Sequence, residues 1–461
     1  MNINKSAPSV LAIAVSLALA GCGGGSSSGP DVSAPPTNPG TRNGGTGNGS
    51  TAAAAPDPAV VDQGPAAKVK VGVIDSGANT HNATISNSVS KVLKFDYISG
   101  APSKVTDISS ADAATQEMAA SHHGTLVSQV IAGNTANDST AGGALGIADI
   151  YAAQTTINAA GNSYAHVNFE AMRHLQEKFG VQLFNGSWGN SKDAQVDPLS
   201  QEFALKVVEN GGLIVVAAGN EAEPTSSDIS QMPVYVGGLK QGFLTVVGLN
   251  PAHTDLYYNS ANDTGSNACG HSASSWCLAS DYVNGPYYDS DQGNQLFGGT
   301  SGAAPTVTAA AALVWSKYPW LSNDQVRQTI LTTADYIDDG SGSKLFNDRF
   351  GWGFLDAEQA VKGPGAFWRI FGNAFKADVD NSKPMYVFSN DIIGDAGLEK
   401  SGLGTLVLSG NNAYTGATDV VQGKLVITGS VAGNVNIGEN GYLAGGGAAG
   451  SAAWASGAGG S

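Results

Sequence analysis

Three residues whose side chains can together perform nucleophilic catalysis occur in three separate motifs of this sequence. Asp75 stands in VIDSGA, His123 in SHHGT and Ser301 in GGTSGAAP. A serine hydroxyl becomes a strong nucleophile when a neighbouring base takes its proton, and a carboxylate orients that base and stabilises its charged form. The three residues are therefore predicted to be the carboxylate, the base and the nucleophile of one catalytic site.

Each of these residues also has a purely structural interpretation. Aspartate before Ser-Gly is common in turns, and His123 can be an exposed residue at a helix start, like His122 beside it. Ser301 can cap the alanine-rich helix that follows it, with Pro305 in the first turn. A single motif match carries a risk of being false. The three motifs together favour catalysis, because each lies at the end of an expected helix or strand.

The spacing of apolar residues predicts the elements that position these side chains. Short β-branched or apolar runs predict buried strands, and apolar residues at helical spacing predict helices. The predicted strands are 69–75, 181–189, 211–220 and 243–250, and the predicted helices are 124–133, 166–180, 304–317 and 323–334. Strands that alternate with helices indicate an α/β domain with a mainly parallel sheet, whose active site lies beyond the carboxyl ends of the strands.

The motifs around Asp75, His123 and Ser301 resemble those of the subtilisin-like serine proteases, the subtilases. VIDSG, HGT and GTSGAAP occur in the family's chain order, and GWGFLDAEQAV at 351–361 resembles its closing segment. The resemblance covers 67–363 and implies a subtilisin-like three-layer domain. It also implies that Ser301 attacks, that His123 rather than His122 transfers the proton, and that Asp75 orients His123.

The resemblance further assigns the groups that stabilise the negative charge of an acyl-transfer intermediate. Asn220, in VVAAGNE, matches an asparagine that acts together with the backbone N–H of the nucleophile. The N–H of Ser301 lies at a helix start, where the helix dipole favours an anion. Taken alone, Asn220 is also consistent with a turn residue. Gly302 departs from the family, which usually has a larger side chain after the nucleophile, and is expected to loosen the helix start.

Two segments match the family's substrate-binding residues. One corresponds to the extended backbone that pairs with the substrate, and the other to the wall of the first specificity pocket. The residues are Ser187, Trp188 and Gly189 in the first segment and Ala217, Ala218 and Gly219 in the second. Trp188 stands where a small aliphatic residue is frequent, and it has two interpretations, as a pocket wall or as buried core. The small residues of the second segment leave room for a large apolar substrate side chain.

The N-terminus has the features of a secretory signal. Lys5 precedes an apolar run at 9–20 that is too short to span a membrane. LAGC at 19–22 resembles the lipobox of bacterial lipoproteins, which implies a signal peptide at 1–21 and lipidation of Cys22. Cleavage at another small residue is the alternative. The composition of 22–66, mostly Gly, Ser, Pro, Thr and Ala, predicts a flexible linker.

Cys269 and Cys277 are predicted to form a disulfide, because an exported chain enters an oxidising compartment. A zinc site is a poor alternative, since His271 is the only further ligand nearby and a structural zinc needs four. Catalysis by serine, histidine and aspartate requires no metal or organic cofactor. Calcium sites are frequent in subtilases, but no dense carboxylate loop commits this sequence to one.

After residue 363 the sequence changes in character. Residues 364–394 are predicted to be a linker, and short apolar runs between Asn-Gly and Ser-Gly turns over 395–448 predict a parallel β-solenoid, with a small antiparallel sheet as the alternative. Residues 449–461 are predicted to be a low-complexity tail. Residues 409–429 resemble the repeat that links passenger and barrel in autotransporters, which implies a C-terminal β-barrel. No long series of alternating ten-residue strands follows residue 450, as expected of a fragment or a truncated gene.

The 461-residue chain carries a net charge of −16, which leaves no basic patch for nucleic acid. Together these features predict a secreted, lipid-anchored serine endopeptidase at the outer membrane or surface of a Gram-negative bacterium. Its predicted substrates are surface or secreted polypeptides, including its own passenger. A non-catalytic adhesin or scaffold with a relict protease fold is the alternative. An α/β-hydrolase esterase is excluded, because Ala303 stands where its G-x-S-x-G motif needs Gly and because the serine comes last in the chain.

Overall fold

The computed structural model describes residues 67–118, 122–155, 165–189, 196–289, 291–454 and 459–460. The predicted signal peptide at 1–21, the lipidation site Cys22 and the linker at 22–66 lie outside these ranges. They remain predictions.

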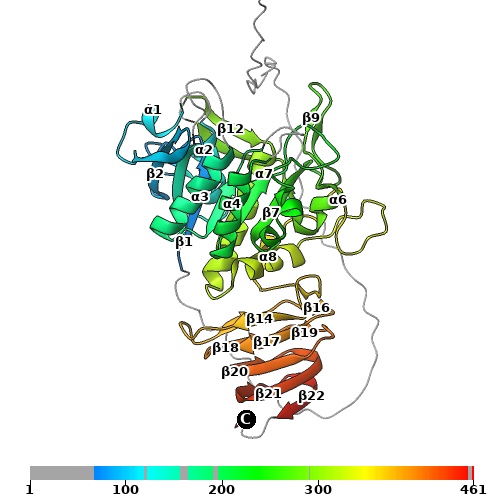
Figure 1. Ribbon diagram of the computed structural model, residues 1–461. Helices are drawn as coiled ribbons and strands as arrows, with labels where there is room; N and C mark the ends of the chain where they lie inside the picture. Colours follow the sequence, from blue (N-terminus) through cyan, green and yellow to red (C-terminus); the bar gives the residue numbers. More distant parts are fainter. Residues whose placement is uncertain are drawn as a thin grey trace, which may run out of the picture. The chain divides into compact units, whose positions relative to one another are not determined.

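An eight-stranded sheet lies at the centre of the larger part of the fold (Figure 1). Its order is β10-β7-β6-β5-β1-β4-β2-β3, and every neighbouring pair is parallel except β2 and β3. The strands are β1 (Val69–Asp75), β2 (Val89–Ile98), β3 (Ala101–Asp107), β4 (Ala148–Thr155), β5 (Leu183–Gly186), β6 (Leu213–Ala217), β7 (Phe243–Leu249) and β10 (Cys277–Asp281). The predicted α/β class with a mainly parallel sheet is confirmed.

Helices cover both faces of this sheet. The α-helices are α1 (Ala113–Gln116), α2 (His123–Ala132), α3 (Ala165–Phe179), α4 (Pro198–Glu209), α5 (Met232–Tyr235), α6 (Gly270–Ala273), α7 (Thr300–Lys317), α8 (Asn323–Thr332) and α9 (Ala357–Ala360). Short 3-10 helices are η1 (Ala136–Asp138), η2 (Gly237–Gly242) and η3 (Ser274–Trp276). None of the helices in the described ranges combines the length and the apolar character needed to cross a membrane.

Strand β1 shows how the sequence produces the layers. Its residues from Val71 to Asp75 are all buried, and successive side chains of a strand point to opposite faces. Val71 and Val73 belong to the apolar cluster that contains α2 and α7, whereas Ile74 belongs to the cluster that contains α3 and α4. The buried run ends at Asp75, so this carboxylate lies at the carboxyl edge of the sheet, where parallel sheets place their active sites.

Two antiparallel hairpins accompany the sheet. One consists of β8 (Tyr258–Asn259) and β9 (Thr264–Gly265), and the other of β11 (Val283–Asp289) and β12 (Gly293–Gly298). The second hairpin leads directly into α7, which follows it after Gly299.

The predicted disulfide between Cys269 and Cys277 is present in the structure, with Cα atoms 5.9 Å apart. Both half-cystines are fully buried, in a small apolar cluster with Ala279 and Phe350. The bond ties the segment before α6 to the first residue of β10, the edge strand of the sheet.

Removing this disulfide is expected to lower the free energy of unfolding by about 2.5 kcal/mol, the loop-closure value for a loop of this length. The test is denaturant unfolding of the double variant Cys269→Ser/Cys277→Ser beside the parent chain. In reducing agent, the free energy of unfolding of the parent should approach that of the variant. An unfolding midpoint that neither treatment moves would mean that the bond does not restrain the unfolded chain.

The C-terminal strands form a second, parallel arrangement, here called the repeat segment (Figure 1). Its strands are β13 (Ala366–Phe367), β14 (Ala374–Asp378), β15 (Tyr386–Phe388), β16 (Ile393–Gly394), β17 (Gly397–Ser401), β18 (Thr405–Leu408), β19 (Asn411–Asn412), β20 (Thr418–Ile427), β21 (Ser430–Ala444), β22 (Ala448–Trp454) and β23 (Gly459–Gly460). All of their pairings are parallel, as a β-solenoid requires, and this excludes the antiparallel alternative.

The boundaries predicted for the repeat segment need correction. Strands β13 to β16 lie within 364–394, where a linker was predicted, and β14 pairs with β17 as an early rung. These strands have two to five residues, too few for an apolar alternation to be recognised. Strand β22 lies mostly within the predicted low-complexity tail, and it pairs with β21. Small residues can form this strand because backbone hydrogen bonds between strands do not require large side chains.

Residues of the predicted linker also contact the elements before it. The side-chain amide of Asn390 donates hydrogen bonds to the carbonyl oxygens of Gln359 (2.9 Å) and Gly363 (2.6 Å). The hydroxyl of the fully buried Tyr318, just after α7, lies 2.7 Å from the carbonyl oxygen of Val387. The segment is therefore packed rather than a free connection.

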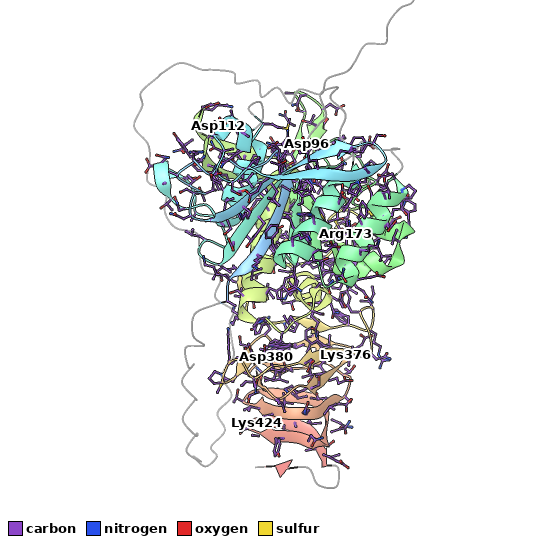
Figure 2. All side chains as sticks on the ribbon, turned by 60° about the vertical axis from the view of Figure 1, so that its left-hand side comes forward. Asp96, Asp112, Arg173, Lys376, Asp380 and Lys424 are labelled. Carbon is purple, nitrogen blue, oxygen red and sulfur yellow. A yellow bond between two sulfur atoms is a disulfide. The ribbon has the colours of Figure 1, made fainter. Side chains whose placement is uncertain are left out.

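Along the repeat segment, most apolar side chains are buried, although Leu403, Val421 and Tyr442 are exposed. The charged side chains are exposed or partly exposed. Lys376 and Lys424, labelled in Figure 2, are exposed, while their neighbours Phe375 and Leu425 are buried. Lys400 is the exception, with a fully buried side chain.

The buried Lys400 is satisfied by backbone groups of two rungs. Its ammonium donates to the carbonyl oxygens of Ser401 (2.6 Å), Gly402 (2.8 Å) and Gln422 (2.9 Å). Burial lowers the pKa of Lys400 to about 8, and the nearby charge of Asp378 opposes that shift. Three acceptors match the three N–H groups of an ammonium, so this lysine links the turn after β17 to β20.

Candidate active site

Asp75 and His123 are joined by a hydrogen bond between the end of β1 and the start of α2. The Nδ1–H of His123 donates to Asp75, with Oδ1 at 2.8 Å and Oδ2 at 3.0 Å. The backbone N–H of Ser76 also donates to Asp75 Oδ1, at 2.7 Å. The Asp75 side chain is only 5% exposed, whereas the His123 side chain is 31% exposed. The carboxylate is thus fixed and buried, and the imidazole keeps its other nitrogen free to act on a bound molecule.

The surroundings of His123 favour its protonated form. Burial is the largest influence and lowers the pKa of His123, but the charge and hydrogen bond of Asp75 and the charge of Glu117 together raise it above its ordinary value. The ring also packs edge-on against Phe297, with centroids 5.3 Å apart. A base that gains affinity for a proton from an adjacent carboxylate is suited to general acid–base chemistry.

Ser301 is the second residue of α7 rather than its N-cap. Gly299 occupies the cap position with φ of +109°, a conformation that favours glycine, and no side chain caps the helix. The structural alternative for Ser301 as a helix cap is therefore excluded. The hydroxyl of Ser301 donates to the carbonyl oxygen of Ser187 at 3.2 Å, and the hydroxyl of Ser187 donates to the carbonyl oxygen of Ser301 at 2.8 Å.

The segment that contains Ser187 and Trp188 is hydrogen-bonded both to Ser301 and to β1, the strand that ends at Asp75. The indole N–H of Trp188 donates to the carbonyl oxygen of Ile74 at 2.8 Å. One set of contacts therefore leads from Ser301 through Ser187 and Trp188 to the end of β1. Among the described residues, the Ser301 hydroxyl is hydrogen-bonded to the Ser187 carbonyl and not to His123. Hydrogen bonds between a nucleophile and its base commonly tighten only when substrate is present.

A buried polar network supports Ser187 from behind. The amide of Asn185, at the end of β5, donates to the Ser187 hydroxyl at 2.9 Å. The hydroxyl of Thr308, on α7, donates to Asn185 Oδ1 at 2.9 Å. Both Asn185 and Thr308 are fully buried. This contact could not be predicted, because nothing in the sequence shows that a threonine two turns after Ser301 faces the end of another strand.

Asn220 lies beside the backbone N–H of Ser301. Its Oδ1 accepts hydrogen bonds from the backbone N–H (2.8 Å) and the hydroxyl (3.1 Å) of Thr300. A methyl group placed on Gly299 would lie 3.5 Å from the Ser301 nitrogen and 3.6 Å from Asn220 Nδ2. Two N–H donors therefore border the same space, and the first-turn N–H of Ser301 has no partner within the helix.

The turn that carries Asn220 is held by a pair of residues that the sequence did not suggest. Asn267 donates its side-chain amide to Glu221 (2.8 Å) and accepts the Glu221 backbone N–H (3.0 Å). Glu221 in turn accepts the backbone N–H of Asn220 at 2.9 Å. Gly219 has φ of +108°, and a Cβ there would lie 2.3 Å from Asn267 Nδ2. Glycine is thus required at this close approach.

The other predicted substrate-binding residues surround this turn and the Ser187 segment. Ala217 and Ala218 are buried, and Gly189 is exposed at the end of a described range. Trp188 is partly buried and packs edge-on against Phe169 of α3, with ring centroids 5.4 Å apart. Its core interpretation is favoured, because both its ring and its N–H contact the interior.

Gly302, whose identity departs from the family pattern, is explained by the hairpin β11–β12. A Cβ at Gly302 would lie 3.0 Å from Asn284 Nδ2 and 3.2 Å from the carbonyl oxygen of Phe297. These distances are tighter than ordinary contacts, so the absence of a side chain lets the hairpin approach α7. The same approach places Phe297 against the His123 ring.

One group of residues in the described ranges resembles a metal site. His122 has ring nitrogens 3.1 Å from Asp291 Oδ2 and 3.8 Å from Asp289 Oδ2. Asp289 is buried, and its oxygens accept hydrogen bonds from the backbone N–H groups of Asp291 and Gln292 and from the Gln295 amide. Protein donors thus account for the buried carboxylate, and the group needs no ion to explain it.

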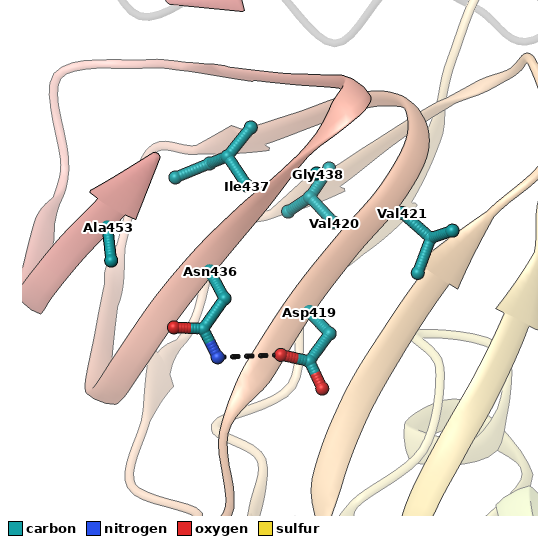
Figure 3. A pocket seen from close by; sticks show the side chains of 7 residues that line it. All are labelled: Asp419, Val420, Val421, Asn436, Ile437, Gly438 and Ala453. Carbon is teal, nitrogen blue, oxygen red and sulfur yellow. Dashed lines mark hydrogen bonds between the residues drawn. The ribbon is translucent and has the colours of Figure 1, made fainter. Parts of the chain in front are cut away.

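A hollow of about 390 Å³ lies on the repeat segment (Figure 3). Its lining residues are Asp419, Val420, Val421, Asn436, Ile437, Gly438 and Ala453. The amide of Asn436 donates to Asp419 at 2.7 Å, as the dashed line in Figure 3 shows. Asp419 is the one titratable group of this lining, so the hollow offers no pair of groups for acid–base chemistry.

Comparison with known families identifies two regions. The model of the subtilase family of peptidases matches residues 66–353, and that of the passenger-associated transport repeat matches 398–427.

Comparison with individual proteins gives relatives of the first region. The neisserial autotransporter lipoprotein NalP of Neisseria meningitidis serogroup B is 34% identical over 280 residues, which is 58% of this chain and 25% of that protein. An extracellular serine protease of Serratia marcescens is 31% identical over 296 residues, covering 52% of this chain and 27% of that protein. The chain thus spans about a quarter of the length of these relatives.

Among solved structures, the S41 psychrophilic protease superposes with a TM-score of 0.48 at 22% identity and covers 63% of this chain and 91% of its own.

Proposed function

The chain belongs to the subtilase family, and we propose that it is a serine endopeptidase that hydrolyses peptide bonds in surface or secreted polypeptides. The observation that carries this proposal is the hydrogen bond from His123 Nδ1–H to Asp75, in a site where Ser301 and Asn220 border one space. The family match over 66–353 supports it, because this region includes all four residues.

In the proposed reaction, Ser301 Oγ attacks the carbonyl carbon of the scissile bond while His123 Nε2 takes the hydroxyl proton. The backbone N–H of Ser301 and the Asn220 amide donate to the oxyanion that forms. His123 then gives its proton to the leaving amine, and the carbon–nitrogen bond breaks. Water attacks the acyl group in the same way, which releases the acid and restores the Ser301 hydroxyl. Asp75 holds His123 in the tautomer that this cycle needs.

The proposed location is the cell surface of a Gram-negative bacterium, with anchoring through a lipid on Cys22. The name of the neisserial relative, an autotransporter lipoprotein, and the passenger-associated repeat at 398–427 support this part of the proposal. Substrates would be polypeptides at that surface, and the chain's own passenger region is included among them.

The decisive experiment is labelling of the full chain with a fluorophosphonate, which reacts with activated serine nucleophiles. We expect the label on the peptide that contains Ser301 and none in a Ser301→Ala variant of equal thermal stability. A folded wild-type chain that does not react would contradict the proposal and favour the adhesin or scaffold alternative.

Asn220→Ala is expected to reduce kcat by about 10²–10³-fold with little change in KM, which is the loss measured in subtilisin when its oxyanion asparagine is removed. The reason is that the amide contacts the oxygen only once it becomes negative. Steady-state kinetics on a peptide substrate provide the measurement. Asn267→Ala, which removes the support of Glu221, is the comparison variant and should change KM as well. An unchanged kcat in Asn220→Ala would remove this residue from the proposed reaction.

A further inference from the structure

Glu117 is a buried carboxyl group beside the proposed catalytic residues. It follows α1 directly and is 3% exposed. Its Oε1 accepts the backbone N–H of Thr125 at 2.8 Å and the hydroxyl of Ser76 at 3.3 Å. Its Oε2 accepts the hydroxyl of Thr125. Both partners belong to the catalytic motifs, since Ser76 follows Asp75 and Thr125 follows His123 by two residues.

Through Ser76 and Thr125, Glu117 joins the end of β1 to the start of α2. The Ser76 hydroxyl also accepts the backbone N–H of Gly124 at 3.0 Å, and the Ser76 N–H donates to Asp75. The backbone of Glu117 forms a bridge with Gly77. Glu117 therefore fixes the two chain segments whose meeting creates the Asp75–His123 hydrogen bond.

The charges that face Glu117 come from these same segments. Asp75 lies at the end of β1, and His122 and His123 lie at the start of α2. Glu117 makes no ion pair with lysine or arginine in the described part of the chain. Burial is the largest influence and raises the pKa of Glu117 to about 7, and Asp75 adds to the rise, while the Thr125 hydrogen bonds and His122 oppose it.

We infer that Glu117 is a positioning residue of the proposed catalytic site, which holds Ser76 and Thr125 in place and, when ionised, stabilises the protonated form of His123. The inference rests on the proposed function, in which His123 is the general base. In this arrangement His123 is flanked by two carboxylates, Asp75 in direct contact and Glu117 behind the two motifs.

Ionisation of the buried Glu117 lowers the stability of the folded protein. Its pKa is higher in the folded protein than its ordinary value of 4.5, so its contribution to stability is present below about pH 4.5 and is lost as the pH rises through about 7. Glu117→Gln keeps the shape of the protonated side chain without the charge. This variant should therefore match the parent in thermal midpoint at pH 4.5 and exceed it at pH 8.

The test measures the proton affinity of His123 directly, by NMR titration of labelled histidines in the full chain with Ser301→Ala. Glu117→Gln is expected to lower the pKa of His123, because the substitution removes one of the two negative charges that raise it. The matched control is Glu170→Gln on α3. Glu170 also accepts the N–H (3.0 Å) and hydroxyl (2.6 Å) of a single residue, Ser103, but lies away from the catalytic motifs, so it should leave His123 unchanged.

In the active chain, the same change should move the acidic limb of kcat/KM to lower pH. The gain in kcat/KM relative to its plateau should be largest near pH 7, where Glu117 of the parent is partly ionised, and should disappear well below that pH, where Glu117 is protonated in the parent. A purely structural role of Glu117 would change kcat/KM at every pH without moving the limb.

The NMR measurement separates this inference from the proposed function, because it does not require hydrolysis. If Glu117→Gln does not fold, carboxyl NMR of the parent decides, with Glu117 expected to titrate near pH 7 and His123 to show an inflection at the same pH. A His123 titration that is equal in Glu117→Gln and Glu170→Gln, or a Glu117 that titrates near its ordinary value, would overturn the inference.

Discussion

Replacing Ser301 by Ala is expected to lower the turnover of a peptide substrate by about 10⁶-fold, the loss known for the corresponding serine of subtilisin. The covalent route depends on this oxygen, and the helix around it does not. Gly299 rather than Ser301 is the N-cap of α7, and the Ser301 hydroxyl donates a single hydrogen bond, to Ser187. The variant should therefore fold like the wild type. The measurement is kcat on a fluorogenic peptide, with protein concentration high enough to detect residual hydrolysis.

Ser187→Ala is the matched control for this prediction. Ser187 exchanges hydrogen bonds with Ser301 but is not the proposed nucleophile. We expect Ser187→Ala to retain fluorophosphonate labelling at a reduced rate, whereas Ser301→Ala should not react at all. Turnover in Ser301→Ala within tenfold of the wild type would show that hydrolysis, if present, uses another group.

Asp75→Asn is expected to reduce kcat by about 10⁴-fold while KM stays nearly constant, as in other serine proteases of the Ser-His-Asp type. An asparagine can present an N–H at the place where the Asp75 carboxylate accepts the Nδ1–H of His123. The imidazole then carries its proton on Nε2 instead of Nδ1, and Nε2 can no longer accept the serine proton. The loss of a full negative charge also lowers the pKa of His123, since that charge contributes to raising it. Steady-state kinetics across pH 5 to 9 measure both effects.

Asp96→Asn provides a control with the same chemical change. Asp96 lies on β2 and pairs with Lys94 at the surface (Figure 2). It should leave kcat unaltered. If Asp75→Asn retained wild-type kcat, the Asp75–His123 hydrogen bond would be structural and the proposed reaction would lose its orienting group.

Sequence reasoning located the elements of the α/β part because their signals are local. The predicted strand at 69–75 is β1 residue for residue, and the predicted helix at 124–133 is α2 within one residue. A short β-branched run bounded by turn residues is typical of a strand that is buried on both faces of a parallel sheet. The strands within 366–394 were not predicted, because strands of two to five residues are too short to show such a pattern.

Which chemical groups are present, and which elements carry them, could be predicted from the amino-acid sequence: Asp75 follows a strand, and His123 and Ser301 lie at helix starts. Motif order was enough for this, since the catalytic residues are part of contiguous local signals. Only the tertiary structure decided that Gly302 accommodates a hairpin, that Thr308 and Asn185 support Ser187, and that Glu117 lies behind the Asp75–His123 pair. These contacts join residues far apart in the chain or on different elements, and such packing leaves no periodic trace in the sequence.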